Sequence, residues 1–309
     1  MSDEASDQEF GDIDEDDLFD VTDFEGAGNL TRSPTVFLTW LPDVLRAAGL
    51  TVQTEPGWET RARGSGSGFR KDPIGVTWHH TASNQTLEQA VQLMCHTQGA
   101  RPIANIAVGR DGTVVVMAAG PTNTSGKSGK ANIKVKMSRG TIPVGGANGT
   151  TVGMECLNNG TGQSWPAAQV DAAFACVLAI NERLGNAPDD VVTHNYYTLN
   201  SDNPAGQARK IDPAKASAVQ GPWQPKGLPN GADTWDNDDL RAECRRRAGT
   251  ASVAAAASTA TGGTYTVQKS DGWFAVARGC GCSLEEVLAA NNATVETPIF
   301  EGEVKQCPS

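Results

Sequence analysis

The chain has 309 residues, long enough for more than one domain, and 39% of them are hydrophobic, so each domain can bury a core. Residues 1–26 carry twelve acidic side chains and no Lys or Arg, which accounts for the formal net charge of −11. The rest of the chain has 24 acidic against 25 basic residues. This near-neutral balance excludes a strongly basic surface, and we expect no nucleic-acid partner.

We expect residues 1–30 to form a disordered acidic arm that adds solubility; an arm that binds a partner or mimics DNA is the alternative. The N-terminus lacks the basic start and the apolar core of a secretion signal. No apolar run has the length of a membrane span. We therefore expect synthesis in the cytoplasm without a signal peptide, and no membrane insertion.

Helical and extended patterns alternate along the chain. This alternation predicts an α/β fold with a mixed central sheet flanked by helices. Helices are predicted at residues 36–49, from a capping box at residues 86–89, at residues 166–184 and at residues 235–247. Strands are predicted at residues 74–80 and 114–117, and a long loop at residues 121–150.

The chain has four histidines, and two of them stand together at the end of the first predicted strand. Neighbouring side chains of a strand point to opposite faces. Trp78 and His80 share the apolar face, so His79 points to the other face and is the candidate metal ligand. His80 is then the buried partner. The fourth histidine, His96, lies on a polar helix face, which predicts an exposed surface residue.

A second cluster of polar residues follows about 130 positions later. Lys210 and Asp212 are two residues apart, so both side chains leave an extended segment on the same side. Carboxylate and imidazole ligands suit zinc. A catalytic zinc site needs three protein ligands and one open position. Together with His194, these residues predict a zinc site formed by His79, His194 and Asp212.

These motifs resemble those of the zinc-dependent N-acetylmuramoyl-L-alanine amidases, the family that shares its fold with peptidoglycan recognition proteins. The family ligands match the first histidine of Trp78-His79-His80-Thr81, then His194, and Asp212 two residues after Lys210. The family glutamate matches Glu155 in Gly153-Met154-Glu155. Where many members carry Tyr-His, this chain has Ala104-Asn105. The resemblance covers residues 70–248, the motif core of a catalytic domain expected at residues 31–248.

The resemblance implies a zinc-dependent hydrolase that cleaves the amide bond between N-acetylmuramic acid and L-alanine in bacterial peptidoglycan. Zinc lowers the pKa of its water toward about 7. Glu155 is the expected general base. Lys210 is expected to stabilise the oxyanion together with the zinc. We expect a monomer that acts on the cell wall as a phage endolysin, after holin-type release from the infected host.

The composition changes after residue 248. Residues 249–263 are rich in Ala, Ser, Thr and Gly and are predicted to be a linker. The pattern of residues 264–309 resembles the LysM module, a βααβ unit that binds glycans containing N-acetylglucosamine. The resemblance places candidate glycan contacts in the two loops beside its groove: Asp271, Gly272, Asn291 and Ile299.

Seven cysteines without a signal peptide favour reduced thiols. Three of them lie in apolar stretches and are predicted core residues: Cys95, Cys156 and Cys176. A bridge between Cys307 and either Cys280 or Cys282 is left open. Two other functions also remain open at this point: a catalytically weak peptidoglycan-recognition protein, and a wall-binding protein of the virion.

Overall fold

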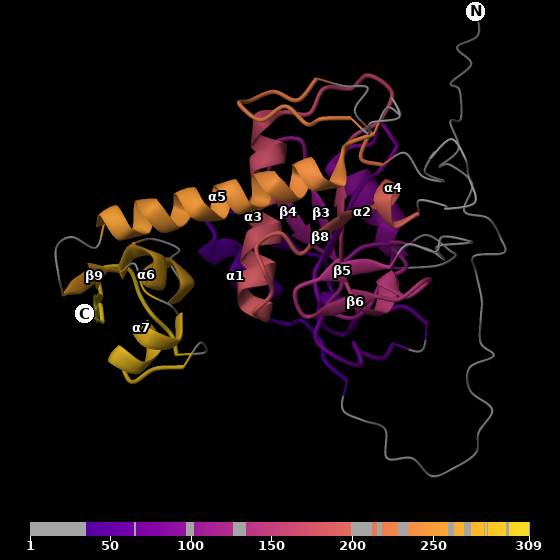
Figure 1. The fold of residues 1–309 in the computed structure, drawn as a ribbon. Helices are drawn as coiled ribbons and strands as arrows, with labels where there is room; N and C mark the ends of the chain where they lie inside the picture. Colours follow the sequence, from indigo (N-terminus) through magenta and orange to yellow (C-terminus); the bar gives the residue numbers. More distant parts are fainter. Residues whose placement is uncertain are drawn as a thin grey trace, which may run out of the picture.

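A six-stranded sheet organises the larger part of the structure, which is a computed structural model (Figure 1). The strands lie in the order β1-β4-β3-β7-β2-β8. The pairs β3–β7, β7–β2 and β2–β8 are parallel. The strand β4 runs antiparallel to β3 and parallel to β1. The sheet is therefore mixed, as predicted. Its strands are β1 Val52–Thr54, β2 Val76–His80, β3 Ile106–Val108, β4 Val114–Val116, β7 Val152–Cys156 and β8 Val191–Thr193.

The structure describes twelve stretches of the chain. They are residues 35–64, 66–96, 102–125, 134–198, 212–214, 218–227, 234–258, 263–268, 273–280, 282, 284–294 and 297–308. The acidic arm predicted for residues 1–30 lies outside them. Among the described residues, no helix combines the length and the apolar character that crossing a membrane requires.

One face of the sheet is covered by three helices: α1 Leu41–Ala47, α3 Ala167–Leu184 and α5 Asn237–Ser258. Trp78 of β2 lies at the centre of this interface and is fully buried. Its ring contacts Phe174 of α3 at 5.2 Å and Trp235 at 5.7 Å between centroids, both edge to face. Such aromatic contacts add to the burial of apolar area, so this face holds the main core.

The opposite face of the sheet has apolar cover at its two ends and buried polar side chains between them. Its cover consists of α2 Leu87–His96, the hairpin of β5 Val135–Met137 and β6 Gly140–Ile142, and α4 His194–Tyr197. The helix α2 packs on Ala107 and Val115, and the hairpin packs on Val192. Between these two apolar clusters, β2 and β7 present Thr77, His79 and Glu155. Buried polar groups thus interrupt the core on this face.

Three sequence predictions are confirmed by local geometry. In the capping box, the Gln89 N–H donates to Thr86 Oγ1 and the Thr86 N–H donates to Gln89 Oε1, at 3.3 and 3.0 Å. The helix α3 ends at Gly185, whose φ of 67° is the left-handed conformation that glycine adopts at low cost. His96 is exposed and pairs with Glu55 at 2.7 Å, as expected for a surface histidine.

Other boundaries differ from the predictions. The helix predicted at residues 36–49 is only Leu41–Ala47, because Val36 instead pairs with Phe69 in an isolated bridge and proline occupies the first helical turn. The long loop predicted at residues 121–150 contains the β5–β6 hairpin and a 3₁₀ helix, η3 Ala147–Gly149. A second 3₁₀ helix, η2 Trp58–Thr60, follows β1.

The helix predicted at residues 235–247 is longer than expected and extends into the segment predicted as a linker, residues 249–263. The helix α5 continues to Ser258, eleven residues past the predicted end at Arg247. The reason is the run of alanines near its end, since alanine has the highest intrinsic helix propensity. A composition of small residues was interpreted as flexible, although in this segment it favours a helix.

The C-terminal module has the predicted order of two strands around two helices. The elements are β9 Thr264–Thr266, α6 Trp273–Cys280, α7 Leu284–Ala290 and β10 Val304–Gln306. The two strands pair antiparallel, and Trp273, Val276 and Val287 form a small core. A disulfide joins Cys280 to Cys307, and Cys282 is a free thiol. Four further cysteines are buried and lie outside the disulfide: Cys95, Cys156 and Cys176, as predicted for core residues, and Cys244.

Replacing Trp78 with alanine should test the aromatic core. Because the fully buried ring contacts α3 and Trp235, Trp78→Ala should lower the free energy of unfolding by about 3–5 kcal/mol. Urea unfolding followed by circular dichroism measures this change. The control is Val144→Ala, at a side chain that is 46% exposed, where a change within about 0.5 kcal/mol is expected. Equal effects of the two substitutions would contradict the assigned core.

Candidate metal centre

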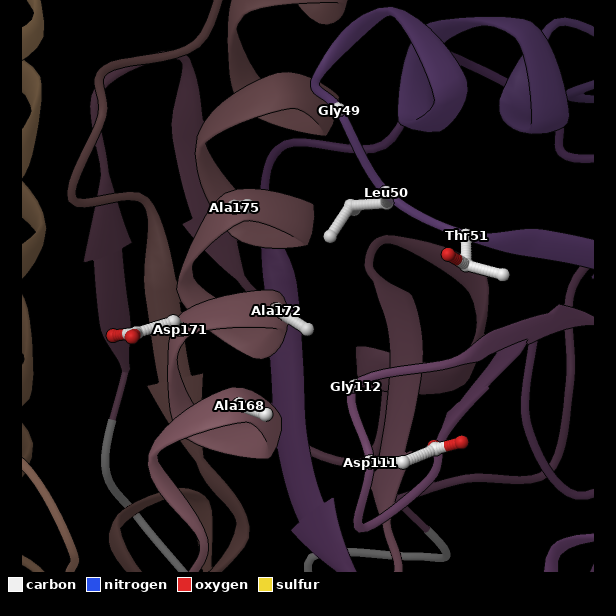
Figure 2. A pocket seen from close by; sticks show the side chains of 9 residues that line it. All are labelled: Gly49, Leu50, Thr51, Asp111, Gly112, Ala168, Asp171, Ala172 and Ala175. Atoms are coloured by element: carbon white, nitrogen blue, oxygen red, sulfur yellow. The ribbon is translucent and has the colours of Figure 1, made fainter.

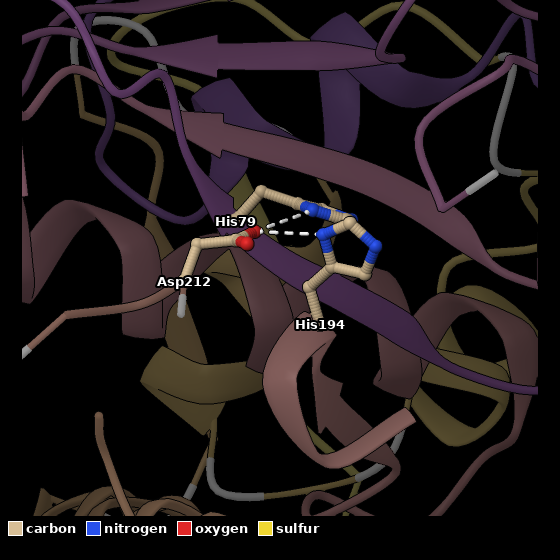
Figure 3. A group of neighbouring side chains, drawn as sticks. All are labelled: His79, His194 and Asp212. Carbon is tan, nitrogen blue, oxygen red and sulfur yellow. Dashed lines mark hydrogen bonds and ion pairs between the residues drawn. The ribbon is translucent and has the colours of Figure 1, made fainter. Parts of the chain in front are cut away.

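The structure brings together three side chains that are far apart in the sequence: His79, His194 and Asp212 (Figure 3). The Nδ1 atoms of His79 and His194 each lie 2.9 Å from Asp212 Oδ2. One ligand atom from each residue lies within 4.8 Å of the other two. All three residues are buried. The predicted ligands therefore form one cluster on the polar part of the sheet.

Parallel strand pairing explains why two histidines meet. Trp78 of β2 is opposite Thr193, the last residue of β8, so the residue after each of them is a histidine: His79 on β2 and His194 at the start of α4. The rings of His79 and His194 lie 4.4 Å apart between centroids. On its other side β2 pairs with β7, where Glu155 is directly opposite His79. One register thus aligns three of the candidate residues that the sequence indicated.

The donor set fits a zinc ion. Two imidazole nitrogens and one carboxylate oxygen are ligands that zinc prefers, and three protein ligands leave a fourth position for a catalytic site. In tetrahedral zinc sites with bonds of about 2.0–2.2 Å, the ligand atoms lie about 3.3–3.5 Å apart. The nitrogen–oxygen separations of 2.9 Å here need to widen only slightly.

Burial sets the protonation states of the cluster. Burial, aided by the charge of His194, lowers the pKa of His79 to about 4, although Asp212 opposes this shift. The ring of His79 is therefore neutral at neutral pH, the form that binds a metal. Burial opposes the ionisation of Asp212, but His194 and His79 outweigh it and hold the pKa of this carboxyl well below its usual range.

The carboxyl group of Glu155 has the opposite tendency. Burial raises its pKa well above the usual range, and the nearby Asp212 carboxylate adds to the shift. Its Oε2 atom is buried and has no hydrogen-bond partner among the described residues. A cation in the cluster would favour the ionised form. A carboxyl group balanced in this way is suited to take up and release a proton.

Asn105 occupies the position of the histidine in the Tyr-His pair that many family members carry, and Ala104 occupies the position of the tyrosine. Asn105 is fully buried. Its Nδ2 donates to the carbonyls of Ala118 and Gly120, and its Oδ1 accepts the Gly153 N–H at 2.9 Å. Asn105 therefore ties the segment after β4 to β7, two residues before Glu155. Its role in this structure is to hold the sheet together beside the site.

The remaining candidate residues are only partly described. Lys210, Asp271 and Gly272 lie outside the described residues. Asn291 donates to the carbonyls of Val287 and Gln306 and accepts the Gln306 N–H, so its amide holds α7 to β10. Ile299 packs half-buried against the core of the module. The assignment of these residues to glycan binding stays a prediction.

Sequence reasoning also missed residues that fix Asp212 in place. Asn195 donates its N–H to the Asp212 carbonyl at 2.9 Å, and Trp165 donates to the Ala214 carbonyl at 3.3 Å. Asn195 directly follows His194 in the sequence, so its nearness to the candidate site could have been predicted. Nothing in the sequence pointed to Trp165, because it contacts this segment only through the fold.

A hollow of about 360 Å³ lies between the segment that follows α1, the helix α3 and the turn after β3 (Figure 2). Its two carboxylates are already engaged: Asp171 pairs with Arg247 at 2.8 Å, and Asp111 accepts from the N–H and the hydroxyl of Thr113. Small side chains of α3 form much of the wall. No group in it is free to bind a ligand by charge, so we assign the functional site to the histidine cluster.

The fold and the cluster define an α/β domain with a candidate metal centre on one face of a mixed sheet. Residues 69–215 match the Amidase_2 family model, which describes N-acetylmuramoyl-L-alanine amidases. The matched part of the chain, somewhat less than half of it, is similar to that family and contains all three clustered residues and Glu155. No curated protein sequence matches the chain.

Several solved structures are similar at low identity. The endolysine N-acetylmuramoyl-L-alanine amidase LysCS from Clostridium intestinale URNW has 13% identity and a TM-score of 0.34, covering 54% of this chain and 89% of that one. Drosophila PGRP-LB has 14% identity and a TM-score of 0.33, covering 47% and 83%. AmpDh3 from Pseudomonas aeruginosa has 18% identity and a TM-score of 0.33, covering 47% and 56%.

The cluster should bind about one zinc ion per chain. His79→Ala removes one of three ligands and should abolish this binding, as measured by metal analysis after dialysis against trace zinc. His96→Ala is the matched control, because His96 is exposed and pairs with Glu55 away from the cluster. Undiminished zinc in His79→Ala, or equal loss in His96→Ala, would contradict the assignment.

Proposed function

We propose that this protein is a zinc-dependent peptidoglycan hydrolase of the endolysin type. The bond that it is proposed to cleave is the amide between N-acetylmuramic acid and L-alanine. The observation that carries the proposal is the cluster of His79, His194 and Asp212 with Glu155 directly opposite His79. The family match over residues 69–215 supports the substrate class, because its description names this amidase activity.

The three clustered side chains would hold the zinc. When bound, it supplies Lewis acidity, which makes water a better nucleophile at neutral pH and polarises a carbonyl group. The neutral ring of His79 and the ionised carboxylate of Asp212 are already in the protonation states that such binding needs. Because the ionised Asp212 carboxylate can only accept, Nδ1 of the neutral His79 ring carries the proton in their contact, and binding of zinc through Nδ1 would require this proton to leave that atom.

Glu155 is the proposed proton carrier. It takes one proton from the attacking water and returns it to the nitrogen of the departing L-alanine, so that a carboxylic acid and an amine result. Two observations support this role: the carboxyl group is buried with a raised pKa, and its Oε2 is free of described partners. We keep Lys210 as the proposed donor to the developing oxyanion, because it is two residues before Asp212.

We propose that the C-terminal module is a LysM unit that binds the glycan strands. Its strand–helix–helix–strand order and antiparallel β9–β10 pair support this assignment. Binding through a second module raises the local concentration of the catalytic domain on the wall. In the endolysin proposal, the enzyme reaches the wall after release through a holin-type pore and acts as a monomer.

Glu155→Gln should separate chemistry from metal binding. The amide keeps the size of the side chain but cannot accept the proton, so the rate on soluble muropeptide should fall by about 10²-fold or more while zinc content is unchanged. Initial rates and metal analysis measure the two effects. Glu59→Gln, at an exposed carboxyl group in η2, is the control and should keep full activity. Wild-type turnover in Glu155→Gln would remove this residue from the mechanism.

Removal of residues 259–309 should separate targeting from catalysis. The cut lies after the end of α5 at Ser258, so the helix that packs on the catalytic domain is kept. Activity on intact sacculi should fall, whereas hydrolysis of a small soluble muropeptide should stay near the wild-type rate. Equal loss on both substrates would mean that the module is part of the catalytic fold and does not act as a targeting unit.

A further inference from the structure

The segment that carries the third proposed ligand lies outside the six-stranded sheet. Besides the Asp212 carboxylate, backbone groups of residues 212–214 contact the rest of the protein. The Asp212 carbonyl accepts from the Asn195 N–H at 2.9 Å, and the Pro213 carbonyl accepts from the Trp235 N–H at 3.0 Å. Ala214 uses both of its peptide groups: its N–H donates to His80 Nδ1 at 3.2 Å, and its carbonyl accepts from Trp165 Nε1 at 3.3 Å.

Two of these four contacts come from the chain neighbours of the other two ligands. His80 follows His79 at the end of β2, and Asn195 follows His194 at the start of α4. The end of β2 therefore has two roles. His79 points to the cluster on one face, and His80 accepts a hydrogen bond from the segment of the third ligand on the other face. A shift of the end of β2 would therefore displace His79 and the segment of Asp212 together. The geometry of the cluster depends on the ligands and on the residues that follow them.

The ring of His80 is held firmly. It is 5% exposed and stands edge-on to Trp165 at 6.2 Å between centroids. A side-chain carbon added at Gly160 would come within 2.4 Å of His80 Nε2, so the chain at Gly160 closes the other side. Because the Ala214 N–H can only donate, Nδ1 must be the acceptor, and this contact fixes the tautomer of the ring.

We propose that His80 is a positioning residue: by accepting the Ala214 N–H it sets the place of the Asp212 carboxylate in the metal centre. This inference rests on the proposed zinc site. Loss of the acceptor leaves a buried N–H unpaired two residues from the ligand, and the segment relaxes toward another partner. Groups that orient metal ligands from outside typically change metal affinity by about 10- to 100-fold when removed.

Three substitutions at residue 80 separate the acceptor from the ring. His80→Asn keeps an acceptor at the place of Nδ1, because both atoms are bonded to Cγ. His80→Gln has the same amide one carbon further out, near the place of Nε2 and against Gly160. His80→Phe keeps the ring but has no acceptor. The control is Thr77→Val on the same strand, whose hydroxyl contacts Thr151 and not residues 212–214.

The experiment measures the zinc dissociation constant of the full chain by competition with a chelating dye. It also records the absorption spectrum of the cobalt-substituted protein and the thermal unfolding of the metal-free protein. His80→Phe and His80→Gln should raise the dissociation constant by about 10- to 100-fold and change the cobalt spectrum. His80→Asn should restore both toward wild type. Thr77→Val should lower stability and leave both unchanged.

The outcomes distinguish this inference from the proposed function. A wild-type chain that binds no zinc would overturn the metal centre and the inference with it. A wild-type chain that binds zinc, together with His80→Phe or His80→Gln variants that bind it as tightly as Thr77→Val, would overturn the positioning role alone. If His80→Phe does not fold, the comparison of the two amides decides, because they carry the same acceptor group and place it one carbon apart.

Discussion

The site depends on one constraint, the parallel register of β2 between β7 and β8. This register places Glu155 opposite His79 and brings His194 to the same level on the other side. Parallel strands all present their carboxyl ends at one edge of a sheet, where loops can add further groups. The third member of the cluster, Asp212, comes from a segment of this kind, outside the sheet. A slip of one residue in β2 would turn His79 into the core and His80 toward the site.

The same strand therefore has two tasks on its two faces. On one face Trp78 packs against α3 and anchors the main core. On the other face the apolar cover formed by α2 and by the β5–β6 hairpin is interrupted by Thr77, His79 and Glu155. Burying these polar groups is costly unless they are paired or bind a metal. The raised pKa of Glu155 expresses this cost, whereas at Asp212 the histidines outweigh burial and lower the pKa; shifts of both kinds mark the place where chemistry is expected.

The sequence was sufficient for the parts of the fold that depend on local patterns. Alternation along residues 74–80 separated His79 from His80, and the capping box at Thr86 gave the start of α2 correctly. The sequence was not sufficient where one composition is compatible with two structures. The alanine-rich segment before residue 259 has the composition of a linker but the propensity of a helix.

The contacts around Asp212 could not be predicted, for a different reason. The bonds of Ala214 to His80 and Trp165 join positions that are 134 and 49 residues apart. No periodicity connects such positions, because their meeting depends on the packing of β2, α4 and the segment before α5 as a whole. The residues of the cluster could be found through their chemistry, whereas the residues that hold them in place could be found only through the fold.

The central claim is that this cluster, loaded with zinc, hydrolyses the amide bond between the glycan and the peptide of the wall. The most direct measurement is the chemistry of the new ends formed on purified sacculi by the zinc-free and the zinc-reloaded protein. The account predicts new free amino groups on L-alanine, with no new reducing sugar ends, and only after zinc is restored. New reducing ends, amino groups on another residue, or equal cleavage without zinc would contradict it.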